Sequence, residues 1–377
     1  MLNNLKALPV LISFQQGGFF MNIAEIDKNL NIDTTINEPD IVWLDVNECP
    51  FAIHGVKYDS SAGRYLRMPA NIAQSVSFGV GVLNDNTAGG RVRFRTNSGF
   101  IGIYAVMKNA PPFSHMPATG KSGFDLYHKT DDREGFVYYH SFIPPCGMTD
   151  GYASGFTTDG CDAEYIINFP LYDNVQALYI ALKKDALLSA PSAYTYEKPV
   201  VYYGSSITQG GCASRPGNSY QAILSRHLDT DYVNLGFSGS ALAEDAIAQY
   251  LAGLDMSVFV CDYDHNVPNT AYLRQTHFHL YETIRKAQPE LPIVFLSAPC
   301  ILLKKDPFTE RRKIIYDTYQ TALNRGDKNV YFIGGEELFA GDDWDSCTVD
   351  GTHPNDLGFY RMAMRIEKTL NFVLKQQ

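Results

Sequence analysis

Residues 198–211, "KPVVYYGSSITQGG", decide the fold because they join an apolar run to a glycine and two adjacent serines. A short apolar run of this kind is typical of a buried strand, and the segment after it has the composition of a turn that leads into a helix. The turn places Ser205 and Ser206 just beyond the carboxyl end of the strand. Either serine is a candidate nucleophile, and the alternative is that both only cap the turn.

From residue 197 to the C-terminus, strand-like and helix-like patterns alternate. The apolar runs "PVVYY", "DYVNLGF", "MSVFVCDYD", "LPIVFLSAP" and "NVYFIGG" are typical of buried strands. Helical periodicity occurs between and after them, in "NSYQAILSRHL", "TAYLRQTHFHLYETIRKAQ", "RRKIIYDTYQTALNRG" and "LGFYRMAMRIEKTLNFVL". Strands that are joined by helices pair in parallel, so residues 197–377 are predicted to form an α/β/α three-layer sandwich around a parallel sheet.

The first half of the chain has a different pattern, the two-residue period of half-buried strands. Strands are predicted in "SVSFGVGVL", "RVRFRTNSGFIGIYAV" and "AEYIINFPLYDNVQALYIAL". In the first of these, one face of the strand would carry Val76, Phe78, Val80 and Val82. Because helical periodicity is almost absent, residues 22–192 are predicted to form an all-β sandwich of the jelly-roll type. A Ser-, Pro- and Ala-rich connector, "SAPSAYTYEKP", separates this domain from the second one.

A row of arginines marks one of the predicted strands, where Arg91, Arg93 and Arg95 alternate with Val92 and Phe94. The favoured interpretation is a solvated outer face, since arginine is rarely buried without a partner. The alternative is a surface that binds an anionic ligand or a sugar.

The composition excludes several classes of partner. A net charge of −10 argues against nucleic acid and against an anionic membrane surface, because both attract basic faces. The 7 cysteines are scattered and form no CxxC pair, so the pattern indicates reduced thiols rather than a zinc ribbon or a disulfide framework. No apolar run is long enough to span a bilayer.

The N-terminal segment, residues 1–30, contains a short apolar run without the small-residue cleavage pattern of a signal peptide. A cytoplasmic location is therefore expected, with secretion as the alternative if this segment acts as a weak signal. Met21 precedes a more regular segment and is an alternative start of the protein.

Functional side chains are expected where the apolar runs end, because ligands bind at the carboxyl ends of parallel strands. Ser206 follows the first run, and Asp350 and His353 stand in "VDGTHPND" near the end of the chain. A hydroxyl that attacks an acyl group needs a base, and an imidazole oriented by a carboxylate supplies one. Pro354 suits the first position of a following helix, which would anchor His353. The competing interpretation is that Asp350 caps the turn and His353 is an ordinary surface residue.

Four blocks in this order resemble the signature of the SGNH (GDSL-type) hydrolases. "YGSSITQG" resembles the first block, with Ser205 in place of the usual Asp, and "NLGFSGS" resembles the second. "DYDHN" stands where Gly-x-Asn-Asp is expected, and "DGTHP" matches the Asp-x-x-His block. The resemblance covers the second half of the chain and implies an SGNH-type, flavodoxin-like fold there.

The resemblance implies roles for individual residues. Ser206 corresponds to the nucleophile, His353 to the base and Asp350 to the residue that orients it. The oxyanion hole would be formed by the N–H groups of Ser206 and Gly236, with Gly239 as the alternative glycine, and by the amide of Asn266. Asp264 is the alternative alignment to Asn266, but an ionised carboxylate would repel a developing oxyanion.

The strand-rich first half looks like the sandwich that precedes the hydrolase in two-domain SGNH carbohydrate esterases. This resemblance implies removal of a small acyl group, most plausibly acetyl, from a sugar or related alcohol, on a small-molecule or oligosaccharide ester. An acyltransferase that uses the same triad and a non-catalytic carbohydrate-binding protein are the alternatives. Neither the oligomeric state nor a contribution of the sandwich to the active site is predictable from the sequence.

Three residues are weaker candidates for substrate binding. Arg215 and Asn218 lie in a loop, "CASRPGNSY", that would wall the acyl or sugar site, and Asp264 belongs to the third block. The competing interpretation makes the loop ordinary, with Asn218 capping the helix that starts near residue 220.

Neither a metal nor a cofactor is expected. His277 and His279 are two apart on a predicted helix and so point to different sides. The cluster of Asp262, Asp264 and His265 has no second compact group of ligands beside it. The charged run "LLKKDPFTERRK" is interpreted as a solvated loop and helix start, with a place at the rim of the substrate entrance as the alternative.

Overall fold

The computed structural model describes residues 35–108 and 113–377. Residues 22–34 of the predicted first domain, Met21 and the N-terminal segment lie outside the described residues. The domain boundaries therefore stay a prediction. The described residues all belong to one compact unit, Thr34–Gln377, which contains both halves of the chain.

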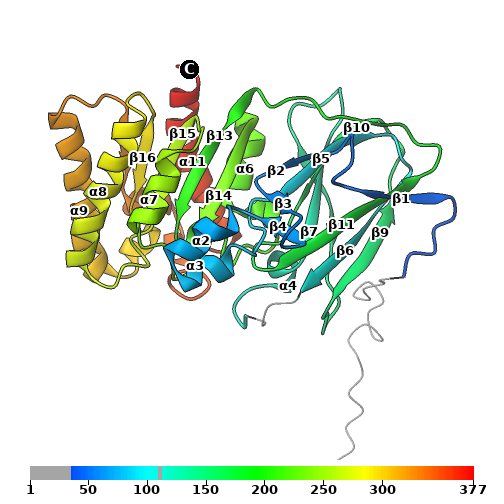
Figure 1. The fold of residues 1–377 in the computed structure, drawn as a ribbon, viewed down its shortest axis with the longest axis horizontal. Coiled ribbons are helices and arrows are strands. Elements are labelled where there is room, and N and C mark those ends of the chain that lie inside the picture. Colours follow the sequence, from blue (N-terminus) through cyan, green and yellow to red (C-terminus); the bar gives the residue numbers. More distant parts are fainter. Residues whose placement is uncertain (1–34, 109–112) are drawn as a thin grey trace, which may run out of the picture. The chain divides into compact units, whose positions relative to one another are not determined.

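The first half is built mainly from antiparallel strands, as predicted (Figure 1). One sheet has the order β1 (Ile41–Asp45), β11 (Asn174–Lys183), β6 (Phe100–Lys108) and β9 (Gly151–Thr157). The other has the order β12 (Leu188–Ser189), β5 (Arg91–Thr96), β10 (Ala163–Asn168), β7 (Phe124–Lys129) and β8 (Val137–Phe142), with β2 (Ala52–His54) also paired to β5. Apolar side chains from both sheets, such as Phe94 and Ile103, form one buried cluster. The more specific jelly-roll description stays a prediction.

The segment "SVSFGVGVL" is helical, which corrects the predicted strand. The chain forms a small pair, β3 (Lys57–Asp59) and β4 (Arg64–Leu66), and then α2 (Ala70–Val76) and α3 (Phe78–Leu83). Ser77 separates the two helices with an extended backbone, and its side chain accepts a hydrogen bond from the Val80 N–H at the start of α3. Val80 is 1% exposed, whereas Phe78 and Val82 are 88% and 53% exposed, so the alternating residues share no buried face.

The second half contains a parallel sheet, which confirms the predicted α/β class. The strands follow the order β14 (Thr230–Gly236), β13 (Tyr196–Gly204), β15 (Val258–Asp262), β16 (Ile293–Leu296) and β17 (Val330–Ile333). The first strand in sequence lies second in the sheet, which is the flavodoxin-like order. Because β13 and β15 are neighbours on the inside of the sheet, the loops that follow them meet at one edge.

Helices cover both faces of this sheet (Figure 1). On one face, Val201 and Tyr203 pack with residues of α7 (Asp245–Ala252), α8 (Thr270–Ala287) and α9 (Lys305–Asn324). On the other face, Val200 and Tyr202 pack with residues of α6 (Tyr220–Leu228) and α11 (Asp356–Leu374). The remaining short helices are α4 (Ala118–Lys121), α5 (Ser206–Gln209), α10 (Gly335–Leu338), η2 (Pro216–Asn218), η3 (Pro299–Leu302) and η4 (Trp344–Ser346). Burial on both faces explains why the strands read as continuous apolar runs.

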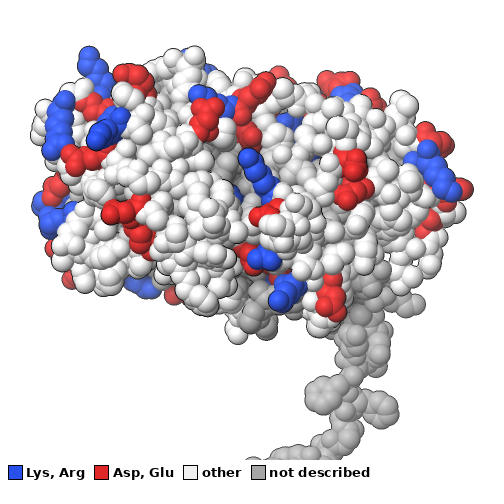
Figure 2. Space-filling view, in the orientation of Figure 1, with Lys and Arg blue, Asp and Glu red and all other residues white. Residues whose placement is uncertain are grey.

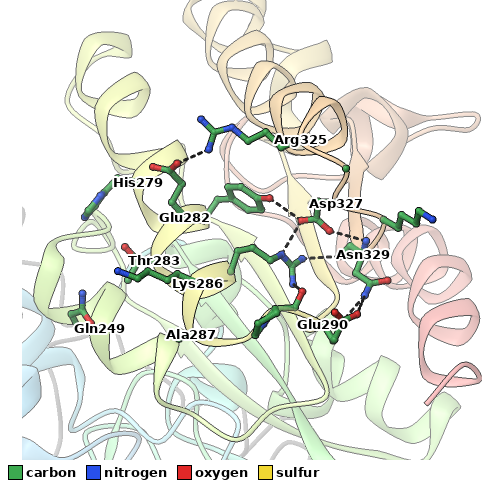
Figure 3. Close-up of a pocket in the computed structure, with 15 residues that line it drawn as sticks. Gln249, His279, Glu282, Thr283, Lys286, Ala287, Glu290, Arg325, Asp327 and Asn329 are labelled. Atoms are coloured by element: carbon green, nitrogen blue, oxygen red, sulfur yellow. Dashed lines mark hydrogen bonds and ion pairs between the residues drawn. The ribbon is translucent and has the colours of Figure 1, made fainter.

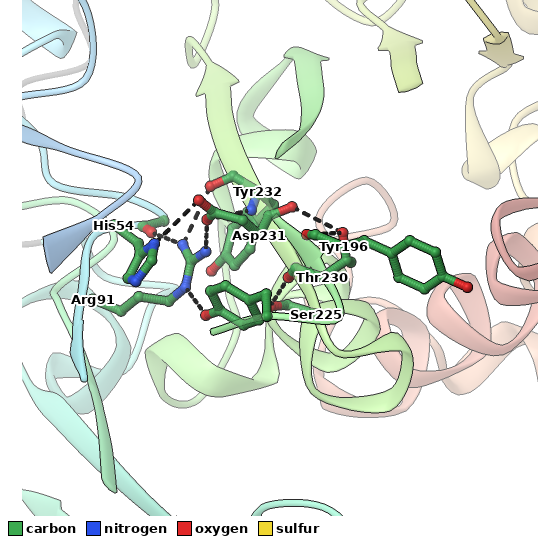
Figure 4. A network of polar contacts seen from close by, with 9 residues as sticks. His54, Arg91, Tyr196, Ser225, Thr230, Asp231 and Tyr232 are labelled. Carbon is green, nitrogen blue, oxygen red and sulfur yellow. Dashed lines mark hydrogen bonds and ion pairs between the residues drawn. The ribbon is translucent and has the colours of Figure 1, made fainter. Parts of the chain in front are cut away.

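The predicted solvated arginine face is wrong for Arg91 and Arg93, whereas Arg95 pairs with the exposed Asp131 and Asp162 at the surface. Arg91 and Arg93 are 1% and 2% exposed. Arg91 joins the sandwich to the edge strand β14, whereas Arg93 pairs with Glu164 of the neighbouring sandwich strand β10. Arg91 forms an ion pair with Asp231, and its guanidinium lies 4.0 Å from the centre of the Tyr232 ring. His54 contributes to the same network through Asp231, at 3.1 Å (Figure 4). These arginines are buried because each has a carboxylate partner, which the alternation of residues does not reveal.

Charged side chains of both signs are intermixed on the face of the molecule in Figure 2. In the described part of the chain, no helix combines the length and apolarity that a membrane span requires.

Candidate active site

The two serines of the opening stretch have different environments at the junction of β13 and α5. Ser205 is the N-cap residue of α5, and its Oγ accepts a hydrogen bond of 3.2 Å from the Ile207 N–H. Ser206 is the first residue of the helix, and 8% of its surface is exposed. Ser205 therefore supports the turn, whereas the hydroxyl of Ser206 faces the imidazole of His353.

Ser206, His353 and Asp350 form a hydrogen-bonded chain. The Oγ of Ser206 lies 2.9 Å from Nε2 of His353, and Nδ1 of His353 lies 2.7 Å from Oδ2 of Asp350. Since a carboxylate accepts, Nδ1 carries the proton and Nε2 presents a lone pair to the serine hydroxyl. This tautomer is the one that a general base for Ser206 requires.

The turn at residues 348–354 orders the carboxylate of Asp350. Its Oδ1 accepts hydrogen bonds from the backbone N–H groups of Thr352 and His353, at 2.9 and 2.8 Å. Burial alone would raise the pKa of Asp350, but these bonds and the imidazole together lower it to about 2. Pro354 is not the first residue of the helix as predicted, because α11 begins at Asp356 with Asn355 as its N-cap.

The backbone N–H of Gly236 does not face the nucleophile, so the structure does not support its predicted place in the oxyanion hole. It donates to Oδ1 of Asn234 at 2.9 Å. A Cβ on Gly236 would lie 2.1 Å from the Gln209 nitrogen, so this glycine allows β14 to approach α5 closely. The alternative glycine, Gly239, is exposed, and its N–H donates to no acceptor among the described residues.

The two candidates of the third block, Asn266 and Asp264, differ in what they contact. Nδ2 of Asn266 donates one hydrogen bond, of 2.9 Å, to the carbonyl of Phe237, two residues before Gly239. An amide has two N–H groups, so the second one stays available. Asp264 is 1% exposed and accepts from the Ala298 N–H at 3.1 Å, while its carbonyl accepts from Arg311. Asp264 is thus engaged in the core at the end of β16 rather than at a surface that substrate can reach.

Arg215 and Asn218, the predicted substrate-binding residues of the loop, hold that loop in place. The guanidinium of Arg215 lies 3.0 Å from Oδ2 of Asp125 and also bonds the hydroxyl of Tyr127, both in β7 of the sandwich. Nδ2 of Asn218 donates to Oγ of Ser214 at 3.3 Å. Asn218 does not cap α6 either, because Ser219 occupies the N-cap position. Both side chains are therefore assigned structural contacts.

The sandwich brings residues to the triad that the sequence did not indicate. The hydroxyl of Tyr172 donates to the carbonyl of Ser206 at 3.2 Å. The ring of His115 lies 5.3 Å from that of His353, and Phe113 packs against Tyr172 at 5.3 Å. No strand pattern or motif marks these residues, because they act through contacts across the fold. The sandwich therefore contributes to this site, through the contacts of Tyr172 with Ser206 and of His115 with His353.

The cavity in Figure 3 lies beside the amino ends of the parallel strands β16 and β17, whereas the triad lies at carboxyl ends. It has a volume of about 1200 Å³, and Glu290 and Asn329 in its wall precede β16 and β17 rather than follow them. The triad stands at the carboxyl ends of the strands, where ligands of this fold class bind. Arg285 and Asp327 line this cavity, and their charges already neutralise each other in an ion pair of 2.8 Å.

Among the described residues, the histidines and acids that the sequence offered as metal ligands form no group with ligand atoms close enough to share an ion. His277 is 2% exposed and bonds Thr318 at 3.0 Å, whereas His279 pairs with Asp245 on the surface. Among the described residues, one group has ligand atoms close enough to bind an ion together: His115, Cys212 and His353.

Two family models match the chain. Residues 197–371 match the model of the GDSL-like lipase/acylhydrolase family, and residues 41–188 match the model of the N-terminus of SGNH-hydrolase-type esterases. The second model is named for the motif Gly-x-Asp-Leu-Tyr, which stands here at residues 123–127 and contains the Asp125 and Tyr127 that bind Arg215. A search of curated proteins finds no match.

Several solved structures are similar over nearly their whole length. One from Bacteroides ovatus, described as a GDSL-like lipase, is 27% identical with a TM-score of 0.79, over 89% of this chain and 98% of that chain. The salicylyl-acyltransferase SsfX3 of a tetracycline biosynthetic pathway is 17% identical with a TM-score of 0.71, over 89% and 98%.

An acetyl xylan esterase from Butyrivibrio proteoclasticus is 12% identical with a TM-score of 0.54, over 89% and 99%. At these two lower identities the likeness concerns the fold. The two family models cover both halves of the chain in the predicted order and agree with the observed sheets. The chain therefore belongs to the SGNH (GDSL-type) hydrolase family and is an esterase of that family with an N-terminal sandwich.

Proposed function

We propose that the protein is a serine esterase that removes a small acyl group, acetyl, from a carbohydrate or related alcohol. The observation that carries this proposal is the hydrogen-bonded chain from Ser206 through His353 to Asp350, with its first bond at 2.9 Å. A serine is a poor nucleophile until a base takes its proton, and this arrangement provides that base.

In the proposed reaction, Oγ of Ser206 attacks the ester carbonyl while Nε2 of His353 takes the hydroxyl proton. The resulting imidazolium is stabilised by the carboxylate of Asp350, whose pKa of about 2 keeps it ionised at neutral pH. The imidazolium then gives its proton to the departing alcohol oxygen as the C–O bond breaks. A water molecule then attacks the acyl-enzyme while His353 takes its proton. The imidazolium returns that proton to Oγ of Ser206 as the acyl C–O bond breaks and the acid leaves.

The negative charge of the tetrahedral intermediate needs hydrogen-bond donors. The N–H of Ser206 is the first in α5 and has no helical acceptor before it. We assign the other two donors to the N–H of Gly239 and the second N–H of Asn266, because the carbonyl of Phe237 ties that amide to the loop of Gly239. Each such donor typically contributes about 10²–10³-fold in rate.

The choice of substrate rests on similar proteins. The acetyl xylan esterase with the same fold supports acetyl as the acyl group and an oligosaccharide as the alcohol. The salicylyl-acyltransferase, with its higher TM-score of 0.71, supports the alternative in which an alcohol other than water accepts the acyl group. Both reactions share one acyl-enzyme, so the acceptor decides between them. A non-catalytic carbohydrate-binding protein is the remaining alternative, and the intact hydrogen-bonded chain argues against it.

Hydrolysis of p-nitrophenyl acetate and of longer p-nitrophenyl esters by the wild type, Ser206→Ala and Ser205→Ala tests the proposal. We expect wild-type turnover to be highest on the acetate, and Ser206→Ala to lower kcat by at least about 10³-fold. Ser205→Ala is the matched control, one residue away in the same turn, and should lose no more than a cap contributes to stability, about 1 kcal/mol. An active Ser206→Ala with normal folding would overturn the assignment.

The acceptor and the natural alcohol are tested separately. Acetylated xylo-oligosaccharides are incubated with the wild type, with and without an added alcohol, and free acetate is compared with the newly acylated alcohol. Release of acetate alone supports the esterase. Transfer that outcompetes water at modest alcohol concentration would show the transferase instead.

A further inference from the structure

The site contains a cluster of three ligand atoms, two of which, on His115 and Cys212, the esterase mechanism does not use. One nitrogen of His115, one nitrogen of His353 and Sγ of Cys212 all lie within 4.8 Å of one another. The three residues come from different parts of the chain: a segment between two sandwich strands, the loop after α5, and the turn before α11. We propose that they form a site for a transition-metal ion of the Zn²⁺ class, which reversibly inhibits the esterase by binding the catalytic imidazole.

The backbone holds the thiol of Cys212 in this position. Cys212 has a φ of 78° and is 3% exposed, and a non-glycine residue in that conformation is uncommon. The preceding residue, Gly211, lies close to the triad, since a Cβ on it would be 3.3 Å from Cδ2 of His353 and 3.1 Å from the carbonyl oxygen of Ser206. The fold therefore fixes Sγ against the catalytic histidine.

The catalytic histidine is already prepared as a ligand. Nδ1 of His353 is bonded to Oδ2 of Asp350 at 2.7 Å, so the nitrogen that can bind an ion is Nε2, whose lone pair faces Oγ of Ser206 at 2.9 Å. A carboxylate behind an imidazole is also the usual support of a metal-bound histidine, because it fixes the tautomer and raises the basicity of the ligand. The same pair thus serves Ser206 or a metal ion, but not both at once.

His115 closes the site from the sandwich side. It is exposed, and its ring lies 5.3 Å from the ring of His353 at an angle of 50°. In a tetrahedral zinc site, ligand atoms at bonds of about 2.0–2.3 Å stand roughly 3.3–3.8 Å apart. Binding therefore requires the ligand atoms to approach one another by up to about 1–1.5 Å, and the exposed His115 ring can supply its share by rotation about its side-chain bonds.

The chemistry of the donors selects the class of ion. Two imidazoles and a thiolate are borderline and soft ligands, which suit Zn²⁺ and not Mg²⁺ or Ca²⁺. On binding, the Cys212 thiol releases its proton to solvent, while both histidines bind as neutral ligands. The ion and the thiolate together carry one positive charge, which the carboxylate of Asp350 behind His353 compensates. Solvent supplies the fourth ligand.

The consequence for catalysis follows from the lone pair, and this step rests on the proposed function. When Nε2 of His353 is bound to the ion, it has no lone pair to take the proton of Ser206. The esterase should therefore be inhibited reversibly, and a chelator should restore the full rate.

Binding itself is measured without activity, by titrating Co²⁺ into full-length Ser206→Ala in which the exposed Cys49, Cys146 and Cys161 are replaced by Ser. We expect one equivalent to bind, with a thiolate-to-cobalt charge-transfer band and the intense visible bands of tetrahedral cobalt. Adding Cys212→Ser should abolish the charge-transfer band. Adding His115→Ala, at an exposed position that should not disturb folding, should weaken binding at least about tenfold, since loss of even a hydrogen-bond partner of a ligand typically costs about 10–100-fold.

The matched control is His279→Ala, an exposed histidine that pairs with Asp245 at 2.9 Å away from this cluster. It should leave the cobalt spectrum and affinity unchanged. Absence of stoichiometric cobalt binding, or the same charge-transfer band after Cys212→Ser, would overturn the metal site whether or not the protein is an esterase.

Inhibition is measured on the wild type with p-nitrophenyl acetate and increasing Zn²⁺. We expect the half-inhibiting concentration to rise at least about tenfold in His115→Ala, each variant being compared with its own uninhibited rate. Cobalt binding to the cluster without any inhibition of an active wild type would overturn the inhibitory role.

Discussion

Oδ2 of Asp125, in a strand of the sandwich, lies 3.0 Å from the guanidinium of Arg215, in the loop that follows the nucleophile. The same oxygen accepts a hydrogen bond of 2.8 Å from the Gly217 N–H, and Oδ1 accepts one of 2.9 Å from Asn168. Asp125 is 0% exposed, so its charge is stabilised by these partners alone. The motif Gly-x-Asp-Leu-Tyr at residues 123–127 therefore contains the residue that binds the sandwich to the loop after the nucleophile.

Replacing Asp125 should destabilise the whole protein. Removing one partner of a buried ion pair leaves the other charge and its donors unpaired, so Asp125→Ala is expected to lower the free energy of unfolding by about 3–5 kcal/mol. Chemical denaturation measures the change. Asp131→Ala is the control: Asp131 pairs with Arg95 but is 81% exposed, so solvent screens the pair and its loss should change stability far less. Equal effects of the two variants would contradict the role of Asp125.

The amide of Asn266 should matter in the transition state. Asn266→Ala is expected to lower kcat about 10²–10³-fold with little change in KM, because the donor acts on a charge that the bound substrate lacks. Steady-state kinetics on p-nitrophenyl acetate measures both values. Asn218→Ala is the comparison, since that amide bonds Ser214 and should change neither constant strongly. A rise in KM for Asn218→Ala would instead restore its predicted role in substrate binding.

Tyr172 should connect the sandwich to catalysis. Its hydroxyl donates to the carbonyl of Ser206 at 3.2 Å, and one such bond contributes about 1 kcal/mol. Tyr172→Phe is therefore expected to lower kcat/KM roughly fivefold while the ring keeps its packing. Tyr138→Phe, on an exposed tyrosine of the sandwich, is the control and should have no effect. An unchanged rate in Tyr172→Phe would mean that the bond does not position the nucleophile.

Asp262 should make stability depend on pH. Burial and the neighbouring Asp264 raise the pKa of Asp262 from 3.8 to about 8. The unfolded chain thus loses this proton near pH 4 and the folded chain only near pH 8, so the contribution of this group to stability falls as the pH rises between these values. Asp262→Asn has no carboxyl group to titrate, so this decrease in stability with rising pH should be absent from the variant.

The melting temperature of Asp262→Asn, measured relative to the wild type, should therefore increase from pH 5 to pH 8. The exposed Asp255→Asn should show no such trend, since Asp255 is 83% exposed. A constant difference across this range would show that Asp262 is already ionised in the folded protein.

Local patterns were sufficient for the parallel sheet and insufficient for α2 and α3. Each strand of the sheet is buried on both faces, so its continuous apolar run has one simple interpretation. In "SVSFGVGVL", apolar residues alternate, yet an extended Ser77 that caps the next helix decides the structure. The capping bond is local, but the packing of Val80 onto the hydrolase core is tertiary, and together they override the two-residue period.

The site shows the same division. The order of the four blocks indicated Ser206, Asp350 and His353, whose geometry now has the expected form. The choice between Gly236 and Gly239 depends on which N–H is already bonded, and only the contact of Gly236 with Asn234 shows that. The buried ion pair of Arg91 with Asp231 was equally hidden, because the partner lies in another half of the chain.

By itself, the sequence determined the two classes of structure, the alternation of strands and helices in the second half, and the residues at the carboxyl ends of its strands, since periodicity and turn composition are local properties. The tertiary structure alone decided which of these residues meet. Ser206 and His353 are separated by 147 positions, and His115 and Tyr172 reach them from the sandwich. Such contacts depend on how buried surfaces of distant segments fit together, a property that no single stretch of the chain contains.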